Sequence, residues 1–194
     1  MTYKNLSPSH RAFLTSLNTI DIPKTTFEAL ESEDWKKAMQ EEMEALKKNR
    51  TWELVKLPKG KKTVGCKWVF TVKYRSDGSL EMYKARLVAK GYSQTYGIDY
   101  LETFAPVAKM NTVRVLLSLA AIKGWNLQQY DIKNAFLNGD LEEEVYMDIP
   151  PGLESNDGQT VCKLKKALYG LKQSPRAWFG RLAKVMMRQG FKQS

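Results

Sequence analysis

The feature that most constrains the fold of this sequence is an alternation of apolar and polar residues on both sides of a turn. In VGCKWVFTVKY (64–74) every second residue is apolar or aromatic, which is the period of a β-strand with one buried face. The segment SDGS (76–79) has the composition of a turn, and LEMYKARLVA (80–89) follows as a second strand. We therefore predict a β-hairpin whose second strand carries Lys84 and Arg86 on one face.

Three other segments have helical patterns. From residue 33 to 48 apolar side chains recur every three or four positions after Ser32, which we predict as the N-cap. Residues 111–124 form an apolar helix pattern that ends at a glycine. The last helix is predicted to begin with Ser174 as its N-cap and Pro175 at the first helical position.

Short strand patterns complete the chain. We predict strands at residues 52–55, at VCKL near the end of the sequence, and at WNLQQYDI (125–132), which carries Asp131. The resulting order of helices and hairpins predicts a mixed α+β fold class. Residues 1–30 contain scattered Pro, Ser and Thr and are predicted to be a weakly structured lead-in, so that 31–194 form the folded domain.

Composition excludes several classes of protein. No segment approaches the apolar length of a membrane span, and the N-terminus lacks the apolar core of a secretory signal, so we expect an intracellular protein. The single histidine, His10, argues against His-dependent acyl transfer and against Cys/His zinc sites. Cys66 and Cys162 are predicted to be buried free thiols, with a disulfide between them as the alternative.

The net charge of +10 is distributed unevenly. Residues 47–90 contain 13 Lys or Arg against 3 Asp or Glu, and residues 163–194 contain 9 against none. Between them, residues 91–162 contain 4 against 10. Each basic block alone is compatible with an ordinary solvated surface. Two basic blocks around an acidic centre also fit a polyanion that lies on the flanks and presents a phosphate to a metal ion bound by carboxylates.

The stretch QYDIKNAFLNGDLEEEVYM contains the main candidate for chemistry, Asp131. A carboxylate at the end of a buried strand costs free energy unless it is paired. Its partner is either protein, through Lys133 or by capping the turn at Asn134, or a metal ion. The sequence has no Gly-rich phosphate loop, and a carboxylate with basic flanks suits metal-dependent nucleotidyl transfer. The acidic run 142–144 is predicted to be solvated rather than metal-binding.

Four segments, taken in order, resemble the reverse transcriptase (RNA-directed DNA polymerase) domain of copia-type LTR retrotransposons: KWVFTVKYRSDGSLEMYKARLVAKGY, GIDYLETFAPVAK, QYDIKNAFLNGDLEEEVYM and LYGLKQSPRAWF. Residues 131–136 have the D-x-x-x-A-[FY] form of the first palm motif of reverse transcriptases. The resemblance extends from about Trp35 to the C-terminus. It implies the fingers and a partial palm of a right-hand polymerase fold within residues 31–194.

The resemblance implies a role for several residues. Asp131 is similar to the family's first catalytic, metal-binding aspartate, and the carbonyl of Ile132 to a further oxygen ligand of Mg²⁺. Phe136 matches the aromatic residue that excludes a ribose 2′-OH. Arg86, with Lys84 as a second cation, matches the arginine that binds the triphosphate. Taken without the family, a structural role is as good an explanation for Asp131 and a better one for the others: Phe136 is then a core residue, and Arg86 and Lys84 belong to a solvated hairpin face.

Gly170 matches the family's glycine before the Ser-Pro pair, where bare backbone approaches nucleotide and template. The preceding position is polar in retroviral enzymes but is Tyr169 here, so no hydrogen-bonding role is carried over to it. The resemblance also implies an RNA template, a DNA primer and a deoxynucleoside triphosphate as partners, together with the rest of a Pol polyprotein and no membrane.

One part of the family's metal site has no counterpart in this sequence. The family uses a Y-x-D-D motif, which the resemblance places after residue 194, and the sequence contains no Asp-Asp pair. A single carboxylate holds Mg²⁺ poorly because the ion needs several ligands. Two hypotheses therefore remain: a reverse transcriptase module that acts within a longer polyprotein, or a catalytically dead retrotransposon-derived fragment that at most binds nucleic acid.

Overall fold

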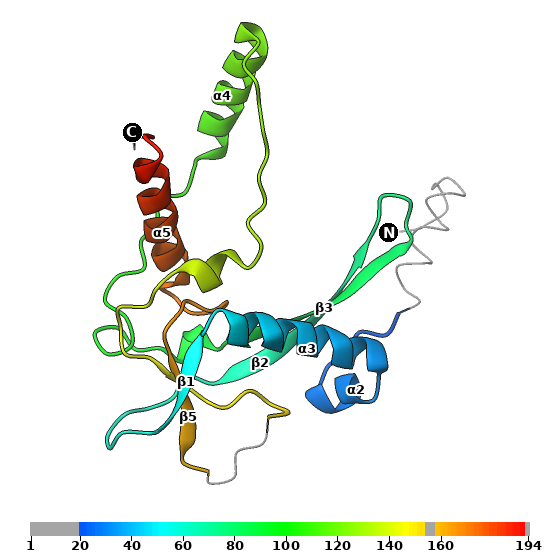
Figure 1. Cartoon of the computed structure of the whole chain (residues 1–194), viewed down its shortest axis with the longest axis vertical. Coiled ribbons are helices and arrows are strands. Elements are labelled where there is room, and N and C mark those ends of the chain that lie inside the picture. The colour runs from blue at the N-terminus through cyan, green and yellow to red at the C-terminus, as the bar shows by residue number, and fades with distance from the viewer. Residues whose placement is uncertain (1–19, 154–157, 193–194) are drawn as a thin grey trace, which may run out of the picture.

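The structure is a computed structural model that describes residues 20–153 and 158–192 (Figure 1). Most of the predicted lead-in therefore lies outside the described residues. Its last part forms a short helix that the sequence did not predict, α2 (Thr26–Leu30), in which the Thr25 hydroxyl accepts a hydrogen bond from the Glu28 amide at 3.2 Å. Ala29 of this helix is fully buried, so α2 belongs to the core.

The predicted hairpin is confirmed. Strands β2 (Cys66–Tyr74) and β3 (Leu80–Ala89) pair antiparallel, with Trp68 opposite Leu87 and Phe70 opposite Ala85. These apolar residues share one face, as the two-residue period requires. Lys84 and Arg86 lie on the other face of β3, where they are half-buried.

Helix α3 (Glu33–Lys48) covers the apolar face of the hairpin and has the predicted bounds (Figure 1). The Trp35 ring meets the rings of Phe70 and Tyr83 edge-on, with centroids 5.4 and 4.8 Å apart. Edge-to-face pairs at this separation add to the free energy gained from burial. Ser32 lies at the N-cap, as predicted, but its hydroxyl makes no capping hydrogen bond.

A second sheet joins segments that are distant in the sequence. It has the order β1-β5-β4, formed by β1 (Trp52–Lys56), β4 (Tyr146–Met147) and β5 (Thr160–Leu164), and both pairings are antiparallel. A bridge between Val64 and Met147 connects it to the residues that precede the hairpin. The core is continuous between the sheets, so the hairpin and the second sheet form one folded unit.

Both cysteines are buried and free, as predicted. Burial raises the pKa of Cys66 to about 11 and that of Cys162 to about 12. Both side chains therefore remain protonated thiols at neutral pH and behave as small core residues.

Helix α4 (Met110–Lys123) ends at Gly124, whose φ of 62° closes the helix in the left-handed conformation, as predicted. It stands apart from the two sheets, joined to them by two extended segments (Figure 1). Its apolar side chains are mostly exposed, among them Leu116, Leu117 and Ile122, while Ala120 is buried. Little tertiary packing among the described residues therefore supports α4, and an isolated helix of this length is only marginally stable in water.

The predicted strand at 125–132 is wrong. These residues are extended but belong to no sheet, and Asp131 is exposed. A β-strand is stable only when a neighbouring strand accepts its backbone hydrogen bonds, and no strand in the described part of the chain lies beside this segment. The burial assumed for Asp131 is therefore absent.

The last helix, α5 (Ser174–Arg188), begins one residue earlier than predicted. Gln173 lies at the N-cap and Ser174 is the first helical residue, because the Ser174 hydroxyl donates to the buried carbonyl of Leu168 at 2.6 Å. With antiparallel sheets and four α-helices in the described residues, the predicted mixed α+β fold class is confirmed.

Candidate functional site

Two of the predicted nucleotide-binding residues contact one aromatic ring, and a third is the next residue in the chain. The guanidinium carbon of Arg86, on β3, lies 5.0 Å from the centroid of the Tyr169 ring. The ring of Phe136, in the 3₁₀-helix η3 (Ala135–Asn138), meets the same ring edge-on at 4.8 Å. Gly170 follows Tyr169 directly in the chain. Residues from three separate segments thus form one cluster, which we call the Tyr169 cluster: Arg86, Phe136, Tyr169 and Gly170.

The close approach of two backbone segments holds this cluster together. The amide of Ala89, at the end of β3, donates to the Tyr169 carbonyl at 2.7 Å. A Cβ atom on Gly170 would lie 2.1 Å from the Ala89 carbonyl oxygen, and one on Gly91 would lie 2.0 Å from the Gly170 oxygen. Gly170 also has a φ of +92°. Only glycine satisfies both conditions, so packing alone already requires a glycine at position 170.

A second close approach fixes the segment that carries Phe136. A Cβ atom on Gly139 would lie 2.8 Å from the Ala177 carbonyl carbon, so this loop is pressed against α5. Leu137 is buried, and Asn134 begins η3 with a φ of 53°, a conformation that asparagine tolerates better than most residues. The side chain of Phe136 is consequently held on the Tyr169 side.

Two buried glutamines connect the loop after Gly170 to the loop after β3, and sequence reasoning missed them. The side-chain amide of Gln94 donates to that of Gln173 at 3.0 Å and accepts from the Lys172 amide at 2.9 Å. Gln173 in turn donates to the Asp99 carbonyl at 3.0 Å. A buried amide is stable only when its hydrogen bonds are made. No sequence signal distinguishes these glutamines from exposed ones.

The face of β3 that carries Arg86 concentrates positive charge. The pKa of Lys84 is lowered, first by burial and then by the positive charges of Arg86 and Lys73. Lys133, two residues after Asp131, has the same effect on Lys84, so the Asp131 segment contributes charge to this face. A lysine ammonium with this pKa shift is stabilised when an anion binds beside it.

One buried carboxylate lies behind these cations. Glu42 of α3 is 9% exposed, and its side chain accepts from the Leu87 amide at 3.4 Å. Burial raises the pKa of Glu42, whereas the hydrogen bond from Leu87 and the charges of Lys84 and Arg86 lower it. The negative charge of Glu42 therefore offsets only part of the positive charge of Lys84 and Arg86.

Asp131 and Ile132 are both exposed and take no part in the Tyr169 cluster's ring contacts. Within residues 20–153 and 158–192 there is no group of three or more His, Cys, Asp or Glu side chains that could hold a metal ion. Because Mg²⁺ needs several anionic or substrate ligands, the described residues by themselves do not fit a magnesium site.

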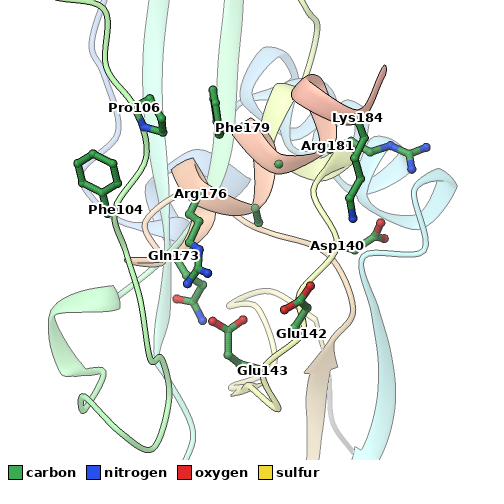
Figure 2. Close-up of a pocket in the computed structure, with 12 residues that line it drawn as sticks. Phe104, Pro106, Asp140, Glu142, Glu143, Gln173, Arg176, Phe179, Arg181 and Lys184 are labelled. Carbon is green, nitrogen blue, oxygen red and sulfur yellow. The ribbon is translucent and has the colours of Figure 1, made fainter. Parts of the chain in front are cut away.

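A separate pocket of about 390 Å³ lies between the acidic run and α5. Figure 2 shows Glu142 and Glu143 facing Arg176 across it, with Arg181 and Lys184 farther along the helix. Neither Arg86, Phe136 nor Gly170 lines this pocket.

The rest of the acidic run is engaged in ion pairs. Glu144 pairs with Lys61 at 2.7 Å and with Lys163 at 3.5 Å. The hydrogen bond from Lys61 is the main reason that the pKa of Glu144 falls to about 2.

Comparison with known proteins identifies the family. The family described as reverse transcriptase (RNA-dependent DNA polymerase) matches residues 49–194. The retrovirus-related Pol polyprotein from transposon RE1 of Arabidopsis thaliana is 51% identical over 178 residues, 91% of this chain. The corresponding polyproteins from transposon RE2 of Arabidopsis thaliana and transposon TNT 1-94 of Nicotiana tabacum are 48% and 54% identical, over 93% and 80% of this chain.

These relatives are much longer proteins, since the chain spans 12% of the length of each. No solved structure matches the chain. No helix among the described residues is long and apolar enough to cross a membrane. From the family match over residues 49–194 and the identity to these polyproteins, the chain belongs to the reverse transcriptase family of copia-type retrotransposon Pol polyproteins.

Proposed function

We propose that this chain supplies the nucleotide-binding part of an RNA-directed DNA polymerase that copies RNA into DNA, and that residues 31–194 are its fingers and part of its palm. The observation that carries the proposal is the Tyr169 cluster. The family resemblance assigns roles to Arg86, Phe136 and Gly170 separately. In the structure Arg86 and Phe136, from two separate segments, contact the ring of Tyr169, which precedes Gly170 in the chain. Separate structural roles for Arg86 and Phe136 do not require that both contact the same ring.

Each residue of the site has a proposed task. Arg86 binds the triphosphate through its planar guanidinium, and Lys84 adds a second positive charge on the same strand face. Phe136 excludes a ribose 2′-OH by its size, which selects deoxynucleotides. Gly170 allows backbone to approach the nucleotide and template, in addition to its packing role against Ala89.

Asp131 and the Ile132 carbonyl are proposed to contribute to a two-metal Mg²⁺ site whose other carboxylates lie outside the described residues. Mg²⁺ held by Asp131, the Ile132 carbonyl and further ligands would supply neutralisation of the charge on the transferred phosphate and activation of the attacking hydroxyl. The exposure of Asp131 leaves its carboxylate accessible for such a shared site. The template and primer are proposed to bind along the two basic blocks, within a longer Pol polyprotein.

The second candidate function is nucleic-acid binding by a catalytically dead fragment. The observation that favours it is the lack of a metal-binding group in the described part of the chain. Both candidate functions use the basic blocks, so a nucleic-acid binding assay does not distinguish them. An assay of DNA synthesis does.

The test is Mg²⁺-dependent primer extension on an RNA template by the Pol polyprotein that contains this chain. We expect Asp131→Ala to reduce extension to background, whereas Asp21→Ala, at another exposed aspartate, leaves the rate unchanged. Extension that survives Asp131→Ala would contradict the metal role. A polyprotein that binds RNA but extends no primer, whatever the residue at 131, supports the dead-fragment function instead.

A further inference from the structure

We infer that Tyr169 is a positioning residue that holds the Arg86 guanidinium and the Phe136 ring in a fixed relation, so that triphosphate binding and sugar selection depend on one side chain. The inference rests on the proposed function of Arg86 and Phe136. It assigns to Tyr169 a role different from that of the polar residue found there in retroviral enzymes, because the contacts are made by its ring.

The first observation is that the Tyr169 ring contacts both residues. Arg86 lies over the ring at 5.0 Å, within the range of a cation–π interaction, and Phe136 meets it with an interplanar angle of 64°. Arg86 comes from the hairpin and Phe136 from η3. Tyr169 is therefore the side chain through which these two elements meet.

The second observation is that the backbone on both sides of Tyr169 is immobilised. On one side Leu168 is fully buried and its carbonyl accepts from the Ser174 hydroxyl at 2.6 Å. On the other side Gly170 is pressed against the Ala89 carbonyl, and the Tyr169 carbonyl itself accepts from the Ala89 amide at 2.7 Å. These contacts hold the backbone of Tyr169, and hence its Cα atom, in place relative to the strand that carries Arg86.

A fixed ring limits the conformations of a flexible neighbour. A free arginine side chain samples many rotamers, and ordering it on ligand binding costs free energy. Contact with the Tyr169 ring removes part of that cost before the triphosphate arrives, while the guanidinium edge keeps its hydrogen-bond donors available for phosphate oxygens. The same ring supports Phe136 from the side, which keeps the excluding ring in place.

The inference distinguishes the ring from the hydroxyl, and this provides a matched pair of variants. Tyr169→Phe keeps the ring, and Tyr169→Leu removes it. Tyr169→Met serves as a second variant without a ring, because its unbranched side chain adapts to irregular space. Tyr92→Leu is the control, since Tyr92 is 79% exposed.

The first measurement uses the ¹⁵N-labelled 194-residue chain and the NMR signal of the Arg86 side-chain Nε–H group, assigned by its loss in Arg86→Lys. The ring current of Tyr169 shifts this signal away from that of a free arginine. We expect the shift to persist in Tyr169→Phe and Tyr92→Leu and to disappear in Tyr169→Leu and Tyr169→Met, while the backbone amide spectrum shows that each variant is folded.

The second measurement is calorimetric titration of the same variants with inorganic triphosphate. We expect Tyr169→Phe to bind as the unsubstituted chain does, and Tyr169→Leu and Tyr169→Met to bind about 3- to 30-fold more weakly, the range expected for loss of a cation–π contact. If affinity for triphosphate falls in the same variants in which the Arg86 Nε–H signal loses its shift, the result supports a positioning role rather than a general structural one.

Two failures can be told apart. If Arg86→Ala weakens triphosphate binding but the variants without a ring bind normally, the positioning role is overturned and the proposed function stands. If Arg86→Ala itself binds triphosphate as the unsubstituted chain does, or the unsubstituted chain binds none, the nucleotide-binding role of Arg86 is overturned, and the inference with it.

Discussion

Phe136 is the residue on which selection of deoxynucleotides is proposed to depend. Its ring is half-buried and fixed against Tyr169, so replacing it with a small side chain opens space where a 2′-OH would lie. We expect Phe136→Ala, in the longer Pol enzyme, to reduce the preference for deoxynucleotides over ribonucleotides by about tenfold or more. The measurement is the ratio of kcat/KM for the two nucleotide types.

The control for this prediction is Phe104→Ala, because Phe104 is 72% exposed and lines the separate pocket of Figure 2. The Phe104→Ala enzyme should prefer deoxynucleotides over ribonucleotides to the same degree as the unsubstituted enzyme. An unchanged ratio in Phe136→Ala would show that selection against the 2′-OH does not depend on this ring.

Glu42 is the residue whose ionisation should affect stability with pH. Burial raises its folded-state pKa above the unfolded value, so its contribution is fully present below the unfolded pKa and is lost as pH rises through the folded pKa. We expect Glu42→Gln, which cannot ionise, to become progressively more stable than the unsubstituted chain as pH rises from about 4, where glutamate ionises in the unfolded chain, until Glu42 is ionised in the folded chain as well. Urea unfolding across this range measures the difference.

Glu44→Gln is the matched control, since Glu44 is exposed on the same helix. The free energy of unfolding of Glu44→Gln, relative to that of the unsubstituted chain, should not increase as pH rises. A Glu42→Gln variant that loses relative stability as pH rises would mean that attraction to Lys84 and Arg86 outweighs the cost of burial.

The junction between β3 and the Tyr169–Gly170 loop depends on glycine. Gly170→Ala brings a Cβ atom to 2.1 Å from the Ala89 oxygen and forces alanine to a φ of +92°. Gly97→Ala forces a similar φ of +80° but meets no atom within 4 Å. We expect Gly97→Ala to cost about 1–2 kcal/mol of unfolding free energy, the price of the left-handed backbone alone, and Gly170→Ala to cost clearly more. Urea unfolding compares them, and equal costs would contradict the close approach.

Elements with a strong local pattern were predictable from the sequence. The β2–β3 hairpin, α3 and α4 were identified from periodicity because each one's pattern is complete within its own residues. The 125–132 strand was predicted wrongly because a local pattern of apolar and polar residues does not supply the neighbouring strand that a sheet requires. The N-cap of α5 was misplaced because a distant carbonyl, that of Leu168, engages the Ser174 hydroxyl.

The candidate site was likewise predictable only in part. Arg86, Phe136 and Gly170 were identified through the family resemblance, but their common contact was not. Tyr169 departs from the retroviral pattern, and its role depends on a meeting of three segments that no local pattern encodes. The buried pair Gln94 and Gln173 escaped notice for the same reason, since burial of a glutamine is decided by tertiary structure.

Over the whole molecule, the two basic blocks, residues 47–90 and 163–194, contain 22 of the 31 Lys and Arg residues. The first block includes the β2–β3 hairpin and the second includes α5. We expect binding of single-stranded RNA to weaken steeply as salt rises, because each neutralised phosphate releases condensed counterions. Lys67 and Lys73 project from the exposed face of β2. The double substitution Lys67→Gln with Lys73→Gln should reduce the slope of log affinity against log salt by about 0.7 for each lost phosphate contact. Binding that is indifferent to salt would contradict a role for these blocks.

We propose that the Tyr169 cluster is the nucleotide-binding site of this chain. The most direct test is a titration of the ¹⁵N-labelled chain with dATP, followed by NMR chemical-shift changes of the backbone amides. We expect the largest changes at Arg86, Phe136, Tyr169 and Gly170. Changes confined to Arg176, Arg181 and Lys184, which line the pocket in Figure 2, would contradict it.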